Sequence, residues 1–208
     1  MNGTLILGAG GHGKVVADIL LLRGIRVLGF LDDQPGHWGS TRLDLPVLGS
    51  IDSYAEYGAE GLALGIGDTS ARRRLVQRLG PACHALWVEA IHPRAVVAAS
   101  ARLGIGATVA AGAVINPDAE LGDHVIVNTG ATVDHDCVIG AYVHIAPGAH
   151  LAGGVRAEDG VLVGIGANVL PGCVIGRWSV IGGGSTVIQD VPAHVTAIGA
   201  PARWPIRV

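Results

Sequence analysis

The sequence predicts two domains, a small α/β domain followed by an all-β domain that coils as a parallel β-helix. Three observations support this prediction. Over residues 1–88, short apolar runs alternate with helix-like runs, and a glycine-rich turn follows the first apolar run. From Ile91 to Pro192, an aliphatic residue recurs at every sixth position. The 208 residues include 33 glycines and one phenylalanine, a composition that suits tight repeated turns around a narrow core.

The first domain is predicted over residues 1–88 as a small Rossmann-like βαβαβ unit. Its expected elements, in order, are a strand at Thr4–Leu7, a glycine turn at Gly8–Gly13, a helix at Lys14–Leu22, a strand at Arg26–Leu31, a loop at 34–46, a helix near Asp52–Tyr57, a strand at Leu62–Ile66, a helix at Thr69–Leu79 and a last strand around His84–Val88.

The glycine turn indicates a phosphate site. Glycines let the backbone approach a phosphate, and the following helix N-terminus offers free N–H groups with a partial positive charge. Gly8, Gly10 and Gly13 match the dinucleotide fingerprint, and Asp32 and Asp33 lie about where its ribose-binding acid lies. An NAD enzyme is therefore one alternative, but the domain has room for one nucleotide-binding half only, which favours a single nucleotide. A turn needed merely to pack the helix on the sheet is another alternative.

The second domain is predicted over residues 89–208, where seventeen hexapeptides run without an insertion from Ile91 to Pro192. Sixteen of their seventeen first positions are Ile, Leu or Val, and every fifth position is a small or short residue. Three hexapeptides make one triangular coil of 18 residues, and successive coils stack about 4.8 Å apart. A β-sandwich would instead show alternation at period two with irregular turn spacing. Glycines recur at second positions, where we expect them to ease the turn.

One segment of the repeats carries candidate catalytic groups. His135 occupies the third position of its hexapeptide, which faces outward, so a role in core packing is not expected. The carboxylate of Asp136, or less favourably that of Asp134, could accept a hydrogen bond from one ring nitrogen and leave the other basic. This arrangement of a base and its orienting acid is the one expected of acyl transfer.

The hexapeptide register resembles that of the left-handed β-helix acyltransferases. The left hand comes only from this resemblance, since the general rule for parallel crossovers favours the right hand. The glycine turn, Phe30–Asp33 and Gly65–Asp68, followed by hexapeptides, resemble along essentially the whole chain the sugar acetyltransferases of bacterial surface-glycan and polysaccharide biosynthesis. These include enzymes that N-acetylate nucleotide-linked 4-amino-4,6-dideoxy sugars, and the sialic acid O-acetyltransferases.

The resemblance implies an acetyl-CoA-dependent transferase that acts as a homotrimer, with a nucleotide-sugar as acceptor and no metal. It implies His135 as the catalytic base and Asp136 as the acid that raises its basicity. The residues that it implies at the nucleotide-sugar are Gly10, Gly11, His12, Asp32, Asp33 and Gly67. The residues that it implies at acetyl-CoA are His144, Ile165 and Gly183, with Asn128 near the active site. Gly199–Arg203 resembles the segment that caps the last coil, which could also serve only to close the sheet edge.

Several functional alternatives remain at this point. N-acetylation of a nucleotide-linked amino sugar is favoured over O-acetylation of sialic acid or another sugar hydroxyl, because the phosphate-binding turn suits a nucleotide-linked acceptor. A metal-dependent carbonic anhydrase needs a His-x4-His pair, which the sequence lacks. A non-catalytic trimeric scaffold that binds sugar nucleotides would not need His135 and Asp136.

Composition excludes other classes of function. Hydrophobic residues make up 50% of the chain, but no apolar stretch reaches the roughly 18 residues of a membrane span, so no membrane insertion is expected. The first residues do not resemble a secretory signal, which predicts a cytoplasmic location. With a net charge of −3 and one short basic run, Arg72–Arg74, no nucleic acid is expected as a partner. The three cysteines form no CxxC motif and are expected to be reduced.

Overall fold

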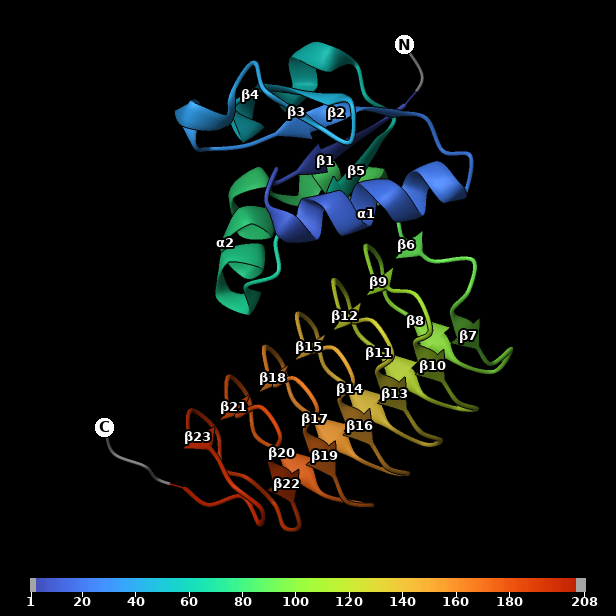
Figure 1. Ribbon diagram of the computed structural model, residues 1–208, viewed down its shortest axis with the longest axis vertical. Helices are drawn as coiled ribbons and strands as arrows, with labels where there is room; N and C mark the ends of the chain where they lie inside the picture. Colours follow the sequence, from blue (N-terminus) through green and yellow to red (C-terminus); the bar gives the residue numbers. More distant parts are fainter. Residues whose placement is uncertain (1–2, 205–208) are drawn as a thin grey trace. The chain divides into compact units, whose positions relative to one another are not determined.

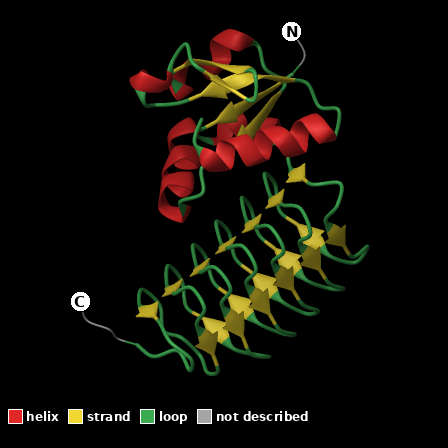
Figure 2. Cartoon of the chain, viewed as in Figure 1, coloured by secondary structure: helices red, strands yellow, loops and turns green. Residues whose placement is uncertain are grey.

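A computed structural model describes residues 3–204 of the chain. The chain divides into two compact units, Met1–Pro93 and Arg94–Val208, whereas the sequence placed the boundary after residue 88. Figure 1 shows the order of the elements, and Figure 2 shows that both long helices belong to the first unit and that short strands fill the second. Each unit is described by itself below.

The first unit is built on a five-stranded sheet with strand order β3-β4-β2-β1-β5. The elements are β1 (Thr4–Leu7), α1 (Gly11–Leu22), β2 (Val27–Leu31), the 3-10 helix η1 (Pro35–His37), β3 (Thr41–Arg42), β4 (Leu45–Gly49), the 3-10 helix η2 (Ile51–Tyr57), β5 (Gly61–Leu64), α2 (Thr69–Leu79) and the 3-10 helix η3 (Pro81–Leu86). All strand pairs are parallel except β3 with β4.

Side chains of β1, which lies between β2 and β5 in the sheet, alternate between two cores, because successive residues of a strand point to opposite faces. Ile6 is fully buried with the apolar face of α1, including Val16 and Leu20. Leu5 and Leu7 are fully buried on the other face in a cluster that includes Leu75 of α2 and Ile51 of η2. The sheet is therefore covered on both faces, and the carboxyl ends of its parallel strands open at the glycine turn.

The structure differs from the predicted elements most at two places, besides α1, which begins at Gly11 rather than at Lys14. The expected loop at 34–46 contains η1, β3 and the start of β4, where Val47 is buried and pairs with Phe30 of β2. The apolar pattern of β4 was not recognised in the sequence because Pro46 and Gly49 interrupt it. Such residues are tolerated here because β4 has only one parallel neighbour. The strand expected around His84–Val88 is wrong: η3 occupies most of it, and only Trp87 makes an isolated bridge to Leu62.

The second unit is a parallel β-helix of two-residue strands. Its strands, preceded by β6 (Ala90–Ile91), are β7 (Val96–Val97), β8 (Arg102–Leu103), β9 (Thr108–Val109), β10 (Val114–Ile115), β11 (Glu120–Leu121), β12 (Ile126–Val127), β13 (Thr132–Val133), β14 (Val138–Ile139), β15 (His144–Ile145), β16 (His150–Leu151), β17 (Arg156–Ala157), β18 (Leu162–Val163), β19 (Asn168–Val169), β20 (Val174–Ile175), β21 (Val180–Ile181), β22 (Thr186–Val187) and β23 (Thr196–Ala197).

These strands form three sheets with parallel pairing. The first sheet contains β7, β10, β13, β16, β19 and β22, the second contains β8, β11, β14, β17 and β20, and the third contains β9, β12, β15, β18, β21 and β23. From β7 to β19, each strand pairs with the strand 18 residues later, as Val114 does with Thr132. The predicted coil of three hexapeptides is confirmed. Figure 1 shows the resulting stack of coils.

The core of the β-helix consists of the first and fifth positions of the hexapeptides. Val133 and Ile145, at first positions, are fully buried, and so are Ala131 and Val143 at fifth positions. The fifth-position side chain thus lies inside the corner of the coil, next to the buried aliphatic side chain of the following strand. This packing explains why the two positions accept such a narrow range of residues.

Glycines serve two different purposes in the coils. The turn itself needs a left-handed residue at the fourth position, for example Gly148 with φ 64° or Asp136 with φ 59°. A second-position glycine has another reason: a Cβ on Gly104 would lie 2.4 Å from the carbonyl carbon of Gly122 in the next coil. The expectation that second-position glycines ease the turn is therefore wrong. They allow adjacent coils to stack closely.

The six-residue register ends before the predicted Pro192. Val169 pairs with Val187 at the full spacing of one coil, but Val180 pairs with Thr196, which is 16 residues away. Asp190 explains how the shortened turn is accommodated, because its carboxylate accepts the hydrogen bond of the Val174 amide at 2.8 Å. The last predicted hexapeptide is replaced by this shorter turn.

Across residues 3–204, none of the helices is both long enough and apolar enough to cross a lipid bilayer. Within the same residues, no group of three or more His, Cys, Asp or Glu side chains is arranged to hold a metal ion.

Candidate active site

The first unit contains a cavity of about 370 Å³ at the carboxyl ends of its parallel strands. All six residues predicted at the nucleotide-sugar line it, together with His37 and residues of the loop after β5. The lining residues are Gly8, Gly10, Gly11, His12, Asp32, Asp33, Gln34, His37, Ile51, Gly65, Ile66 and Gly67. The structure thus brings together residues that are far apart in the sequence.

The glycines of the turn have separable roles. A Cβ on Gly13 would lie 2.2 Å from the carbonyl oxygen of Gly8, so Gly13 is required for helix-on-sheet packing. For Gly10 and Gly11, no non-adjacent heavy atom of residues 3–204 lies within 4 Å of an added Cβ. These two glycines face open space at the first turn of α1. They leave room for a ligand beside the N–H groups of the helix N-terminus.

Asp32 fastens the glycine turn to the end of β2. One carboxylate oxygen accepts the Ala9 amide at 2.7 Å, and the other accepts the Gln34 amide at 2.8 Å and lies 3.2 Å from His37 Nδ1. Burial raises the pKa of Asp32, but the hydrogen bonds from Ala9 and Gln34 and the contact with His37 outweigh it, so the pKa lies below its ordinary value. The carboxylate is therefore ionised and is held by the protein.

Asp33 and Gly67 both line the cavity, and each is held by an arginine. The Asp33 carboxylate pairs with Arg78 of α2 at 2.8 Å and remains half-exposed. The Gly67 carbonyl accepts a hydrogen bond at 2.8 Å from Arg72, whose side chain is almost fully buried. Arg72 also donates to the carbonyl of Ile66 at 3.3 Å, so one buried guanidinium holds the loop after β5 in place.

In the second unit, His135 and Asp136 form the predicted pair. His135 lies in the turn between β13 and β14, and its Nδ1 is 2.7 Å from Asp136 Oδ2. The left-handed backbone of Asp136 turns its side chain back toward the preceding ring. Because the carboxylate only accepts hydrogen bonds, Nδ1 carries the proton and Nε2 keeps its lone pair. Both side chains are exposed, at 61% and 67%.

Two acids make the His135 ring more basic. The hydrogen bond to Asp136 contributes most, and the negative charge of Asp134 adds to it, so the pKa of His135 lies above the ordinary histidine value of 6.5. Asp134 does not orient the ring: its carboxylate accepts the His135 backbone amide at 2.8 Å and the amide group of Asn116 at 2.8 Å. The sequence left Asp136 and Asp134 open as the orienting acid, and the geometry selects Asp136.

Gly153 lies one coil beyond His135 and provides the surface on which the imidazole rests. A Cβ at Gly153 would lie 2.6 Å from both Cε1 and Nε2 of the ring. A side chain there would displace the nitrogen that bears the lone pair. Sequence reasoning missed Gly153, although its position 18 residues after His135 is a signal that the repeat supplies.

The residues predicted at acetyl-CoA gather on another corner of the β-helix. His144 in β15 and Asn128 after β12 meet in adjacent coils, with Nε2 and Nδ2 3.1 Å apart. Ile165 and Gly183 stack in the turns that join the third sheet to the first, and 66% of Ile165 is exposed. His135 instead lies in the turns that join the first sheet to the second. Within one chain, His135 and the predicted acetyl-CoA residues therefore lie at different corners of the β-helix.

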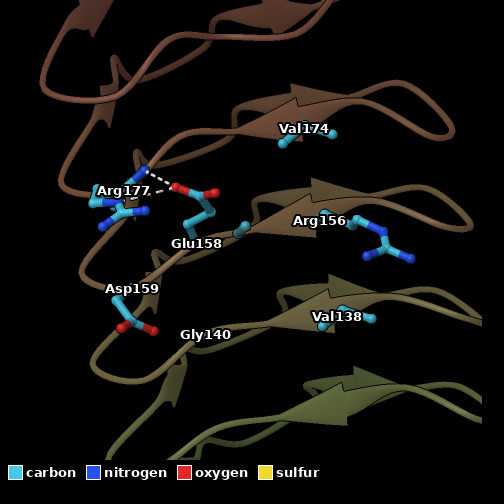
Figure 3. Close-up of a pocket in the computed structure, with 8 residues that line it drawn as sticks. Val138, Gly140, Arg156, Glu158, Asp159, Val174 and Arg177 are labelled. Atoms are coloured by element: carbon cyan, nitrogen blue, oxygen red, sulfur yellow. Dashed lines mark hydrogen bonds and ion pairs between the residues drawn. The ribbon is translucent and has the colours of Figure 1, made fainter.

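A second cavity of about 370 Å³ lies on the outer face of the second sheet. Figure 3 shows Arg156 between Val138 and Val174 on neighbouring strands, and Glu158 turned toward Arg177. Glu158 accepts the Arg177 backbone amide at 2.8 Å and pairs with its guanidinium at 3.4 Å. Among the described residues that line the two cavities, none is His135 or a predicted acetyl-CoA residue.

Comparisons with known proteins match both units. Residues 4–79 match the family model of the PglD N-terminal domain, and residues 118–153 and 158–189 match the model of the bacterial transferase hexapeptide (six repeats). An uncharacterized protein of Acanthamoeba polyphaga mimivirus, L142, is 33% identical over 101 residues, which are 49% of this chain. The matched stretch spans about one fifth of that curated relative, since it covers 20% of its length.

Solved structures share the whole fold. PerB from Caulobacter crescentus, in complex with CoA and GDP-perosamine, is 42% identical with a TM-score of 0.90, over 97% of this chain and 96% of that one. The acetyltransferase domain of PglB from Neisseria gonorrhoeae, in complex with acetyl coenzyme A, is 37% identical with a TM-score of 0.88, over 98% and 99%. WeeI from Acinetobacter baumannii is 28% identical with a TM-score of 0.88, over 98% and 99%.

These likenesses extend over both units and include the hexapeptide coils. The α/β unit followed by a left-handed parallel β-helix, predicted from the sequence, is thereby confirmed. On this evidence the chain belongs to the hexapeptide-repeat, left-handed β-helix family of sugar acetyltransferases.

Proposed function

We propose that this protein is an N-acetyltransferase that moves the acetyl group of acetyl-CoA to a nucleotide-linked amino sugar of the 4-amino-4,6-dideoxy type. The observation that carries the proposal is the pair of His135 and Asp136, which leaves a basic Nε2 on the surface of the β-helix. The cavity beside the glycine turn supports a nucleotide-linked acceptor. The relative PerB was solved with CoA and GDP-perosamine, which is consistent with this acceptor class.

The proposed reaction is a direct transfer. The neutral amine of the sugar attacks the thioester carbonyl, and Nε2 of His135 takes the proton that the nitrogen loses. Asp136 stabilises the imidazolium that forms, because its carboxylate already accepts the Nδ1 proton. The tetrahedral intermediate collapses, the C–S bond breaks, and the departing thiolate takes the proton back from His135. The products are the acetamido sugar and CoA.

In the first unit, we assign the phosphates of the acceptor to the open space beside Gly10 and Gly11, at the first turn of α1. His12, Asp32, Asp33 and Gly67 complete the proposed nucleotide-sugar site. The proposed location of the reaction is the cytoplasm, where acetyl-CoA is available.

We further propose that the working form is a homotrimer. His135 lies on one corner of the β-helix, whereas His144, Ile165 and Gly183 lie at or beside another. Packing of chains side by side would bring the His135 corner of one chain to the acetyl-CoA corner of its neighbour, where Asn128 adjoins His144. Light scattering at micromolar concentration should give the mass of three chains, and a monomer would contradict this part of the proposal.

The substitution His135→Ala tests the catalytic assignment. With acetyl-CoA and a 4-amino nucleotide-sugar, kcat should fall by at least about 100-fold, the lower end for the loss of a general base. His84→Ala is the matched control, because His84 is an exposed histidine outside both cavities, and it should keep the wild-type rate. An unchanged rate for His135→Ala would remove this residue from the mechanism.

Two measurements separate the remaining alternatives. Thermal-shift screening against UDP, GDP, TDP and CMP-sialic acid identifies the nucleotide, because a ligand that binds only the folded state raises the melting temperature. Mass spectrometry of products from an amino sugar and from its hydroxyl analogue separates N- from O-acetylation. A wild-type protein that binds the nucleotide-sugar but transfers no acetyl group would support a non-catalytic scaffold.

A further inference from the structure

Five residues around the nucleotide cavity form a closed circuit of contacts. Asp32 Oδ2 accepts the Ala9 amide at 2.7 Å, and the Ala9 carbonyl accepts Arg42 Nε at 3.2 Å. Arg42 Nη1 donates to the Ser40 hydroxyl oxygen at 2.9 Å, and this hydroxyl donates to the His37 carbonyl. The circuit closes where His37 Nδ1 lies 3.2 Å from Asp32 Oδ1. It joins the glycine turn, the end of β2, η1 and β3.

His37 is the member of this circuit, besides Asp32, that lines the cavity. Its side chain is 30% exposed, whereas the Asp32 carboxylate is turned into the protein and is 12% exposed. The segment that carries His37 is held at a second point, because the indole N–H of the next residue, Trp38, donates to the Asp32 carbonyl at 2.7 Å. The imidazole is thus held in one place at the cavity wall.

The negative charge of Asp32 favours one of the two ring nitrogens of His37 as the site of the proton. The pKa of Asp32 is lowered, so its carboxylate is ionised and only accepts hydrogen bonds. Asp32 Oδ1 lies 3.2 Å from Nδ1 without hydrogen-bond geometry, but its negative charge favours the proton on Nδ1, and in that neutral tautomer Nε2 is an acceptor. An acceptor cannot bind a diphosphate, which has no donor near neutral pH. It suits a hydroxyl group.

The place of His37 in the fold selects the hydroxyl. In nucleotide-binding βαβ units, the ribose lies at the carboxyl end of the second strand, beside the acid that follows it. His37 comes directly after this point, in the turn that follows Asp32 and Asp33. Asp32 is mostly enclosed by its own protein partners, and the more exposed carboxylate of Asp33 is paired with Arg78. The imidazole of His37 is the remaining group that can face a ribose there.

We propose that His37 binds a ribose hydroxyl of the nucleotide through Nε2, and that Arg42 and Ser40 are positioning residues that hold His37 and the glycine turn in register. This inference rests on the proposed nucleotide-sugar site and adds to it a binding residue and the group that the residue recognises.

The binding test compares one nucleoside diphosphate with its 2′,3′-dideoxy analogue on the full-length protein by calorimetry. The diphosphate is the one that raises the melting temperature most in the screen. The wild type should bind the analogue about fivefold more weakly or worse, the effect of losing one hydrogen bond. In His37→Phe and His37→Ala, affinity for the diphosphate should fall by about the same factor, and the two ligands should bind alike. His84→Phe is the matched control and should keep the wild-type preference.

The positioning role needs a different measurement. Arg42→Met should raise KM for the nucleotide-sugar by about fivefold and reduce the preference for the hydroxylated ligand, with kcat unchanged, because the chemistry lies in the other unit. Arg42→Lys, which keeps one donor, should recover part of the preference, and Ser40→Ala should lose part of it. A residue with only a structural role would lower the melting temperature and leave the preference intact.

The outcomes distinguish the inference from the proposed function. If the wild type acetylates the sugar but both His37 variants keep the preference for the hydroxylated nucleotide, the inference is wrong and the proposed function stands. If these variants lose affinity for the diphosphate but not for the nucleoside, His37 binds phosphate, and the inference is equally overturned. If the wild type binds no nucleotide at all, the proposed nucleotide-sugar site itself fails.

Discussion

The two units of this protein encode their structure in different ways. In the β-helix, a residue's neighbours are the residues 18 positions before and after it, so one repeated pattern specifies every strand pair except that of β21 with β23. In the α/β unit, β1 pairs with strands that begin at Val27 and Gly61, and nothing in the sequence spacing gives these registers. The comparison teaches that equivalent substitutions should have uniform effects in the β-helix and individual effects in the α/β unit. The predictions below test this difference.

The largest effect is expected at the glycine turn, where adjacent glycines have different roles. In Gly13→Ala, the new Cβ meets the Gly8 carbonyl at 2.2 Å, so the protein should lose roughly 3 kcal/mol of unfolding free energy and its detectable nucleotide affinity. In Gly10→Ala, the Cβ meets open space, so stability should change by less than about 0.5 kcal/mol. Denaturant titration and calorimetry measure both quantities. Equal destabilisation by the two variants would contradict the assigned roles.

Gly153→Ala should affect catalysis far more than folding. The three atoms nearest to the added methyl group all belong to the His135 ring, the closest at 2.6 Å, and this exposed ring can rotate away. We expect kcat to fall by about 10- to 100-fold, because a displacement near 1 Å of a catalytic group has effects of this size. The melting temperature should stay within a few degrees of the wild type. A normal kcat would show that the position of Nε2 over Gly153 is not the catalytic one.

The uniformity of the β-helix core can be tested with Val→Ala substitutions. Val109, Val127 and Val163 are all fully buried first-position residues of the third sheet. Each substitution should cost about 1–3 kcal/mol, with the three values close to one another, because each side chain leaves the same kind of cavity. Chemical denaturation measures the cost. A spread as wide as that among core residues of the α/β unit would refute the uniform environment.

The smallest effect is expected in the pH dependence of the rate. The raised pKa of His135 means that kcat/KM should fall, as pH decreases, at a pH above the ordinary histidine value of 6.5. Asp136→Asn removes the main cause of the shift while keeping a residue that tolerates the left-handed backbone. The acidic limb of the profile should then move to lower pH, and the maximum rate should decrease. An unmoved acidic limb would show that another group controls it.

Sequence reasoning succeeded where a local pattern specifies the structure. The hexapeptide register predicted the coil length, and Thr4–Leu7 and Thr69–Leu79 were predicted as the structure has them. It failed where tertiary contacts override the pattern. Strand β4 forms because Val47 can pair with Phe30, although Pro46 and Gly49 make the segment look like a loop. The turn after Val187 is two residues shorter than the repeat, and there the carboxylate of Asp190 takes the place of a backbone acceptor.

The sequence by itself determined the repeating coil and the presence of a histidine beside an acid, because each depends on residues that are close along the chain. Only the tertiary structure decided that Asp136 rather than Asp134 orients His135, and that Asp32 contacts both Ala9 and His37. The physical reason is that a shift of a few tenths of an ångström between donor and acceptor is enough to make or break a hydrogen bond. Such distances are set by the packing of segments that the sequence keeps far apart.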